Sequence, residues 1–180
     1  MNKKQSPVLK LVFSGVFLAL CMVLPFLTGQ IPEIGSRLSP MHIPVLLCGF
    51  VCGWPYGLAV GLIAPLMRTL IFGSPPMFPP IAPAMAFELA AYGLLAGLLY
   101  KRLPKKAPFI YITLITSMLA GRAVWGGAAY VLFGARGIPF GFSAFIAGAF
   151  IDAVPGIILH IILIPALVAA LKRARLILNE

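Results

Sequence analysis

The sequence predicts an all-α membrane protein, a single integral membrane domain over residues 1–180 folded as a six-transmembrane-helix bundle with cytoplasmic N- and C-termini. Three observations predict this fold class. Hydrophobic residues make up 61% of the chain and charged residues only 10%, so the polar groups are too few to cover a soluble domain. The apolar residues form runs of membrane-spanning length. Basic residues are concentrated in alternate gaps between these runs, which is the pattern of cytoplasmic loops.

The distribution of basic residues gives the orientation. Two of the 14 Lys and Arg residues, Arg37 and Arg136, fall in predicted outer loops, and Arg68 and Arg122 fall inside spans. The others lie in segments predicted to face the cytoplasm: Lys3, Lys4, Lys10, Lys101, Arg102, Lys105, Lys106, Lys172, Arg173 and Arg175. The net charge of +10 is therefore interpreted as membrane topology and not as a sign of nucleic-acid binding.

The first three helices are predicted over about residues 8–28, 42–54 and 56–72. The first is interpreted as a span and not as a signal peptide, because no small-residue cleavage site follows it. The apolar run 42–72 is too long for one span of roughly 20 residues, and Trp54 and Pro55 break it at a tight cytoplasmic turn. Glycines recur every four residues around that turn and predict close helix contacts: Gly49, Gly53, Gly57 and Gly61.

The other three helices are predicted over about residues 84–100, 109–133 and 151–172. Five prolines in residues 73–83 predict a stiff, non-helical outer loop. The last apolar stretch forms either one long kinked helix or an outer half-helix followed by a span. We favour the second, because Pro155 suits the first turn of a helix and Asp152 just before it would cap the free amides.

Four ionisable residues lie inside these spans: Arg68, Glu88, Arg122 and Asp152. A guanidinium at membrane depth costs roughly 3 kcal/mol, so it is retained where it has a partner and usually a task. A helical rise of about 1.5 Å per residue places all four in the outer half of the bilayer core. We therefore expect them to converge on one polar cavity that opens outward. The alternatives are a pair of structural salt bridges and, for Arg68, snorkelling to the headgroups.

Aromatic and small residues accompany these charges. Trp125 shares a helical face with Arg122, and Tyr92 follows Glu88 by one turn. Phe78 in the outer loop either covers the cavity or rests on lipid, and His42 and His160 are weaker candidates for ligand contacts. Small residues around Arg122 and Trp125 either leave room for a ligand or permit tight helix packing: Gly121, Gly126, Gly127, Ala128 and Ala129.

Catalytic arrangements are missing from the sequence. There is no HExxH, GxSxG or phosphate-binding lysine loop, so zinc proteolysis, serine hydrolysis and ATP hydrolysis lack their parts. Cys48 and Cys52 are one helical turn apart but have no helical histidine nearby. We expect no enzyme activity, no metal site and no cofactor.

Residues 44–61, PVLLCGFVCGWPYGLAVG, are similar to the P-x-L-L-x-G-x-x-x-G-P-x-x-G pattern at the helix 2 to helix 3 turn of a known family. Gly15 and Ala19 form a small-xxx-small patch on the first helix, and a long loop follows that helix. With six spans in 180 residues, the chain resembles, over essentially its whole length, the substrate-binding S components of energy-coupling factor (ECF) vitamin transporters.

The resemblance implies a high-affinity substrate-binding subunit of an ECF-type ABC importer in the bacterial plasma membrane. In that family the vitamin binds in an outward pocket formed by the first loop, the loop between helices 3 and 4, and helices 4 to 6. The first helix docks onto a membrane T component, powered by two cytoplasmic ATPases that hydrolyse the ATP. The docking patch falls on Gly15 and Ala19, where the family commonly has two alanines. Arg68 stands in a region where members often have an acidic residue.

The expected ligand is a small heteroaromatic vitamin or precursor, because mixed charges favour a neutral or zwitterionic compound. A vitamin B6 form or hydroxymethylpyrimidine leads, and thiamine, pantothenate and a folate remain open. The residues expected to bind it are Glu88, Arg122, Trp125, Tyr92, Asp152, Arg68, Phe78 and His42. A stand-alone secondary transporter would need an inverted repeat or a second gate, which the sequence does not show. A membrane enzyme and a structural subunit are the remaining alternatives.

Overall fold

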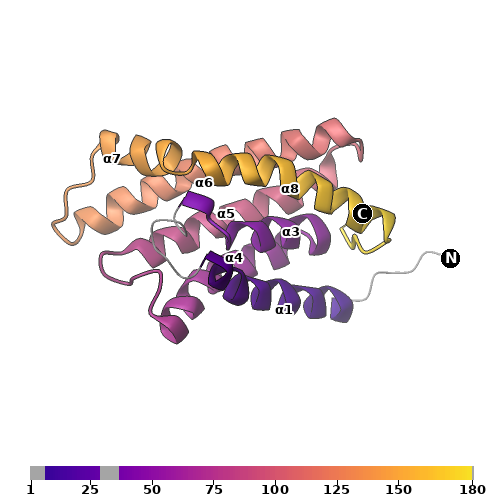
Figure 1. Cartoon of the computed structure of the whole chain (residues 1–180), viewed down its shortest axis with the longest axis horizontal. Coiled ribbons are helices and arrows are strands. Elements are labelled where there is room, and N and C mark those ends of the chain that lie inside the picture. The colour runs from indigo at the N-terminus through magenta and orange to yellow at the C-terminus, as the bar shows by residue number, and fades with distance from the viewer. Residues whose placement is uncertain (1–6, 29–36, 180) are drawn as a thin grey trace.

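The computed structural model describes residues 7–28 and 37–179, and these form helices and connecting turns, with no strand among them. Lys3, Lys4 and residues 29–36 of the first loop lie outside the described residues. The helices run along the long axis of the molecule, and α1 begins at the end of the bundle where α8 ends (Figure 1). They are α1 (Pro7–Val23), η1 (Leu24–Thr28), α3 (His42–Cys52), α4 (Trp54–Phe72), α5 (Ile81–Arg102), α6 (Ala107–Gly134), α7 (Phe142–Ile146), η2 (Ala147–Ile151) and α8 (Val154–Arg173).

In the described part of the chain, five helices are long and apolar enough to cross a membrane: α1 with its extension to Leu27, α4, α5, α6 and α8. Helix α3 is different, because it has 11 residues and every one of them is buried. At about 1.5 Å per residue it covers roughly half of the bilayer core. The prediction of membrane spans is therefore confirmed for five helices. A sixth full span and the cytoplasmic placement of the termini stay predictions.

Glycines bring α4 and α5 into direct backbone contact. A Cβ atom on Gly57 would lie 2.5 Å from the Gly93 carbonyl oxygen, and one on Gly61 would overlap the backbone of Leu89. Gly49 of α3 approaches the same Gly93 carbonyl, so its Cβ would lie 2.6 Å away. The predicted role of the repeated glycines in close helix contact is confirmed, because any side chain there would separate the helices.

Two helix starts differ from the sequence prediction. Helix α5 begins at Ile81 and not near residue 84, because Pro83 lies within its first turn, where its missing N–H would have no intrahelical partner. The favoured half-helix arrangement is confirmed before α8, which has a proline in its first turn. The predicted cap was wrong: the N-cap residue is Ala153, and no side chain caps the helix. Asp152 precedes it with an exposed side chain.

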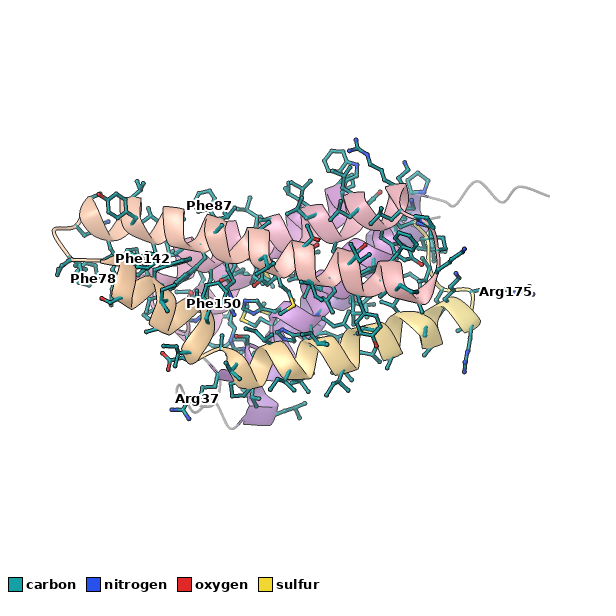
Figure 2. The ribbon with its side chains drawn as sticks, turned by 90° about the horizontal axis from the view of Figure 1, so that it is seen from above. Arg37, Phe78, Phe87, Phe142, Phe150 and Arg175 are labelled. Carbon is teal, nitrogen blue, oxygen red and sulfur yellow. The ribbon has the colours of Figure 1, made fainter. Side chains whose placement is uncertain are left out.

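The two ends of the bundle differ in chemistry. At one end the loop after α5 meets the end of α8, where Lys172 Nζ donates to the Lys105 carbonyl oxygen at 2.9 Å. Figure 2 shows Arg175 at this end, and Phe78 and Phe142 at the opposite end. The basic loop and the basic tail thus lie on one side, as the predicted topology requires.

Candidate functional site

An ion pair lies inside the bundle, between α5 and α6. Arg122 Nη1 is 2.9 Å from Glu88 Oε1, and the two side chains are 10% and 1% exposed. The Tyr92 hydroxyl, one turn along α5 from Glu88, donates to the same carboxylate oxygen at 3.1 Å. A buried carboxylate is tolerated in such a place because a cation and a hydroxyl satisfy it.

Two histidines complete this group. His42 begins α3, and its Nε2 atom lies 3.5 Å from Glu88 Oε1. His160 of α8 stacks on His42 with 5.9 Å between ring centroids and 22° between planes. Both imidazoles are buried. We call the five residues from α3, α5, α6 and α8 the polar cluster: His42, Glu88, Tyr92, Arg122 and His160.

Several polar atoms of the cluster have no hydrogen-bond partner among the described residues. They are His42 Nδ1, Arg122 Nε and His160 Nε2, and His42 Nε2 has only its longer approach to Glu88. An unsatisfied buried polar group costs about 1–3 kcal/mol, so these atoms call for a water or a ligand. Within the described ranges, 7–28 and 37–179, no group of three His, Cys, Asp or Glu side chains is arranged to hold a metal ion.

Aromatic rings occupy the space beside two glycines near the cluster. A Cβ atom on Gly121 would overlap the Tyr92 ring, and one on Gly126 would overlap the Phe145 ring. Tyr92 therefore lies directly against the backbone of α6. Of the two predicted roles for the small residues, tight packing is the one observed at Gly121, whereas Gly126 packs against Phe145 and also lines a cavity.

An open aromatic cavity of about 280 Å³ lies beyond the cluster, and two of its lining rings, Tyr130 and Phe142, are 69% and 77% exposed. Its lining, which defines the name aromatic cavity, is Gly126, Tyr130, Phe140, Gly141, Phe142 and Phe145. Trp125 packs edge-on against Phe140, with centroids 5.7 Å apart, and stacks on Phe145 at 6.3 Å. Arg122, Gly126 and Tyr130 are spaced four residues apart on α6 and so share one face. The cavity therefore begins about one helical turn from the polar cluster.

The predicted convergence of four charges was wrong for two of them. Arg68 is buried, but its Nη1 atom donates to the Met22 carbonyl oxygen at 2.8 Å. Its guanidinium lies over the rings of Phe26 and Phe72, 5.5 and 5.1 Å from their centroids. It therefore contacts the end of α1 and does not pair with Glu88. Asp152 is exposed at the junction of η2 and α8, because the turn there directs it away from the bundle interior.

A model of the family "ECF transporter, substrate-specific component" matches residues 9–170. The chain belongs to this family. It is thus a subunit of a transporter, and the five long apolar helices make it a multi-pass membrane protein. The searches of curated proteins and of solved structures returned no match.

In this S component the predicted docking patch lies on the outside of the bundle. Gly15 and Ala19 are exposed, and a Cβ atom on Gly15 would meet nothing within 4 Å. The neighbouring Ser14 is buried and lies against α3, where Cys48 Sγ approaches its hydroxyl at 3.8 Å. One side of α1 therefore packs on the bundle while the Gly15 side stays open.

Sequence reasoning placed some members of this site and missed others. It expected Glu88, Arg122, Tyr92 and His42 to share one site, and the structure brings them together. It gave His160 little weight, because a lone histidine in an apolar helix has no visible partner in the sequence. Phe78 is 66% exposed, 6.0 Å from the Arg136 guanidinium, so its contact with a ligand stays a prediction. The phenylalanines of α7 and the preceding loop were missed, although their density in residues 140–150 was a visible signal.

Proposed function

We propose that this S component binds a small heteroaromatic vitamin or vitamin precursor between the polar cluster and the aromatic cavity. A vitamin B6 form and hydroxymethylpyrimidine are the first candidates, followed by thiamine, pantothenate and a folate. The observation that carries the proposal is the set of polar atoms around the Glu88–Arg122 ion pair that have no partner in residues 7–28 and 37–179. These atoms offer hydrogen bonds to a ligand and are otherwise costly to bury.

The chemistry of these atoms limits the ligand. Arg122 Nε can only donate, whereas each imidazole nitrogen donates or accepts according to its tautomer. A ring nitrogen and a neighbouring hydroxyl or amine match such a set. The ion pair already neutralises its own charges, so a ligand with a large net charge would remain uncompensated in the interior. A neutral or zwitterionic compound is favoured for this reason.

The aromatic cavity suits the ring of such a ligand. Its volume of about 280 Å³ is close to the lower end of the range for small-molecule sites, roughly 300–1,000 Å³. Tyr130, Phe140 and Phe145 present faces and edges on which a heteroaromatic ring packs favourably. A ligand ring in this cavity would lie about one turn of α6 from Arg122, so the polar groups of the ligand could face the polar cluster.

Transport requires partners that supply energy. We propose that the protein lies in a bacterial plasma membrane with its basic end in the cytoplasm. There it docks on a membrane T component through Gly15 and Ala19, and two cytoplasmic ATPases hydrolyse the ATP. The exposed, small-residue side of α1 supports the docking assignment, because small residues allow close helix approach.

Tryptophan fluorescence tests the ligand site. The chain has two tryptophans: Trp125 packs among the cavity phenylalanines, and Trp54 begins α4 beside the α3–α4 turn. Titration of the detergent-purified protein with pyridoxine, pyridoxal, hydroxymethylpyrimidine, thiamine, pantothenate and folate should show saturable quenching by one compound class. The quenching should disappear in Trp125→Phe and persist in the matched variant Trp54→Phe. Quenching that survives in Trp125→Phe, or no response to any compound, would reject the proposed site.

Docking is tested separately from ligand binding. Gly15→Trp places a large side chain on the open side of α1 and should abolish co-purification with a T component while leaving ligand affinity unchanged. Leu20→Trp is the matched control, since Leu20 is also exposed but lies about 140° around the helix. Equal loss of the complex in both variants, or in neither, would reject Gly15 as part of the docking patch.

A further inference from the structure

The segment after α8 folds back onto the bundle. Arg175 has a φ of 58°, a left-handed conformation that reverses the chain. The amide of Leu178 then donates to the Val51 carbonyl oxygen at 2.8 Å. Ile177, Leu178 and Asn179 are each 5% exposed. Residues 177–179 are therefore inserted at the end of the bundle where α3 turns into α4.

Asn179 joins two helices through its side chain. Its Nδ2 atom donates to the Gly97 carbonyl oxygen of α5 at 2.9 Å and to the Gly49 carbonyl oxygen of α3 at 3.3 Å. An asparagine amide has two N–H donors, so this side chain uses both. Gly53 lies beside it, where a Cβ atom would be 2.9 Å from Asn179 Oδ1. The glycine at the turn thus leaves the space that the asparagine occupies.

Small residues make up much of the surface that Asn179 bridges, and α3 and α5 also share an aromatic pair, Phe50 with Tyr100. Gly49 of α3 faces Gly93, Ala96 and Gly97 of α5, and these small residues allow close approach but interdigitate little. Smooth helix faces can slide along each other, whereas a buried polar side chain specifies one register. Two hydrogen bonds from one amide to two different helices are such a constraint.

The same two helices carry most of the polar cluster. His42 begins α3, and Glu88 and Tyr92 lie on α5, so the register of α3 against α5 sets the distance between His42 Nε2 and Glu88 Oε1, 3.5 Å here. We propose that Asn179 is a positioning residue: it fixes α3 against α5 from the end of the bundle and thereby holds His42 beside Glu88. This inference concerns the geometry of the cluster and holds whichever ligand binds there.

Histidine NMR tests the proposal directly. The chain has two histidines, both in the cluster, so ¹⁵N-histidine labelling of the full chain in detergent reports on the cluster alone. Asn179→Asp keeps the size of the side chain but removes both N–H donors. We expect Asn179→Asp and Asn179→Ala each to shift the His42 imidazole resonances. Leu176→Ala is the control, because Leu176 belongs to the same segment but is 38% exposed. It should leave the resonances in place.

Unchanged His42 resonances in a folded Asn179→Asp protein would overturn the proposal. A lower melting temperature of that variant would not rescue it, because it would show only that Asn179 stabilises the fold. Equal shifts in Leu176→Ala would overturn it as well, because the effect would then belong to the whole segment. Hydrogen exchange of the wild-type protein keeps the proposal testable where the variants fail to fold. The Asn179 side-chain amide should exchange as slowly as the backbone amides of α3 and α5, and rapid exchange would contradict it.

Discussion

Two buried arginines occupy regions of opposite character. Arg68, between α4 and the end of α1, donates to a backbone carbonyl and lies over two phenylalanine rings. Arg122, between α5 and α6, pairs with a carboxylate and leaves its Nε atom without a partner among the described residues. Arg68 therefore caps the Met22 carbonyl at the end of α1. Arg122 retains hydrogen-bonding capacity that a ligand can use.

The surroundings show the same contrast. Two phenylalanine rings flank Arg68, whereas two histidines and a tyrosine surround the Glu88–Arg122 pair. A charge buried at membrane depth is costly in either place. At Arg68 the cost is offset by packing and one hydrogen bond, so a structural role accounts for it. At Arg122 the Nε atom has no partner among the described residues, and this difference is the basis for assigning function to the second region.

The largest expected effect is that of Arg122→Met. It leaves Glu88 buried without its cation, and breaking a buried pair in this way costs about 3–5 kcal/mol. The free energy of unfolding in detergent measures the loss. The double variant Glu88→Gln with Arg122→Met should recover most of the stability, because it removes the orphaned charge. A double variant as unstable as Arg122→Met would show that the pair is not the source of the effect.

Arg68→Met should have a smaller effect. The lost hydrogen bond from a charged donor is worth about 1.5–3 kcal/mol, and removing a charge from membrane depth offsets part of that loss. The methionine can still contact Phe26 and Phe72 through its sulfur. Unfolding under the same conditions as Arg122→Met gives the comparison. A loss of stability at Arg68 as large as at Arg122 would erase the distinction between the two regions.

The sequence predicts the helices well, but it predicts the partners of the buried charged residues only in part. The apolar runs and the turn at Gly53 follow from composition and from one helix-breaking pair of residues. Helical rise predicts the depth of Arg68 and Arg122 in the bilayer, but a predicted depth says nothing about the direction that a side chain takes around its helix. Arg68 points to α1 and Arg122 to α5, a difference set by helix packing. His160 received too little weight for the same reason. Its partner His42 lies far away in the sequence, and only helix packing brings the two rings together.

The most direct test compares ligand affinity in Arg122→Lys and Arg68→Lys by isothermal titration calorimetry, using whichever vitamin quenches Trp125. Lysine keeps the charge at both positions but lacks the planar, multidentate donors of arginine. We predict at least about tenfold weaker binding for Arg122→Lys, equivalent to roughly 1.4 kcal/mol, and unchanged affinity for Arg68→Lys. Unchanged affinity in Arg122→Lys, or equal weakening in both variants, would contradict a ligand site at the polar cluster.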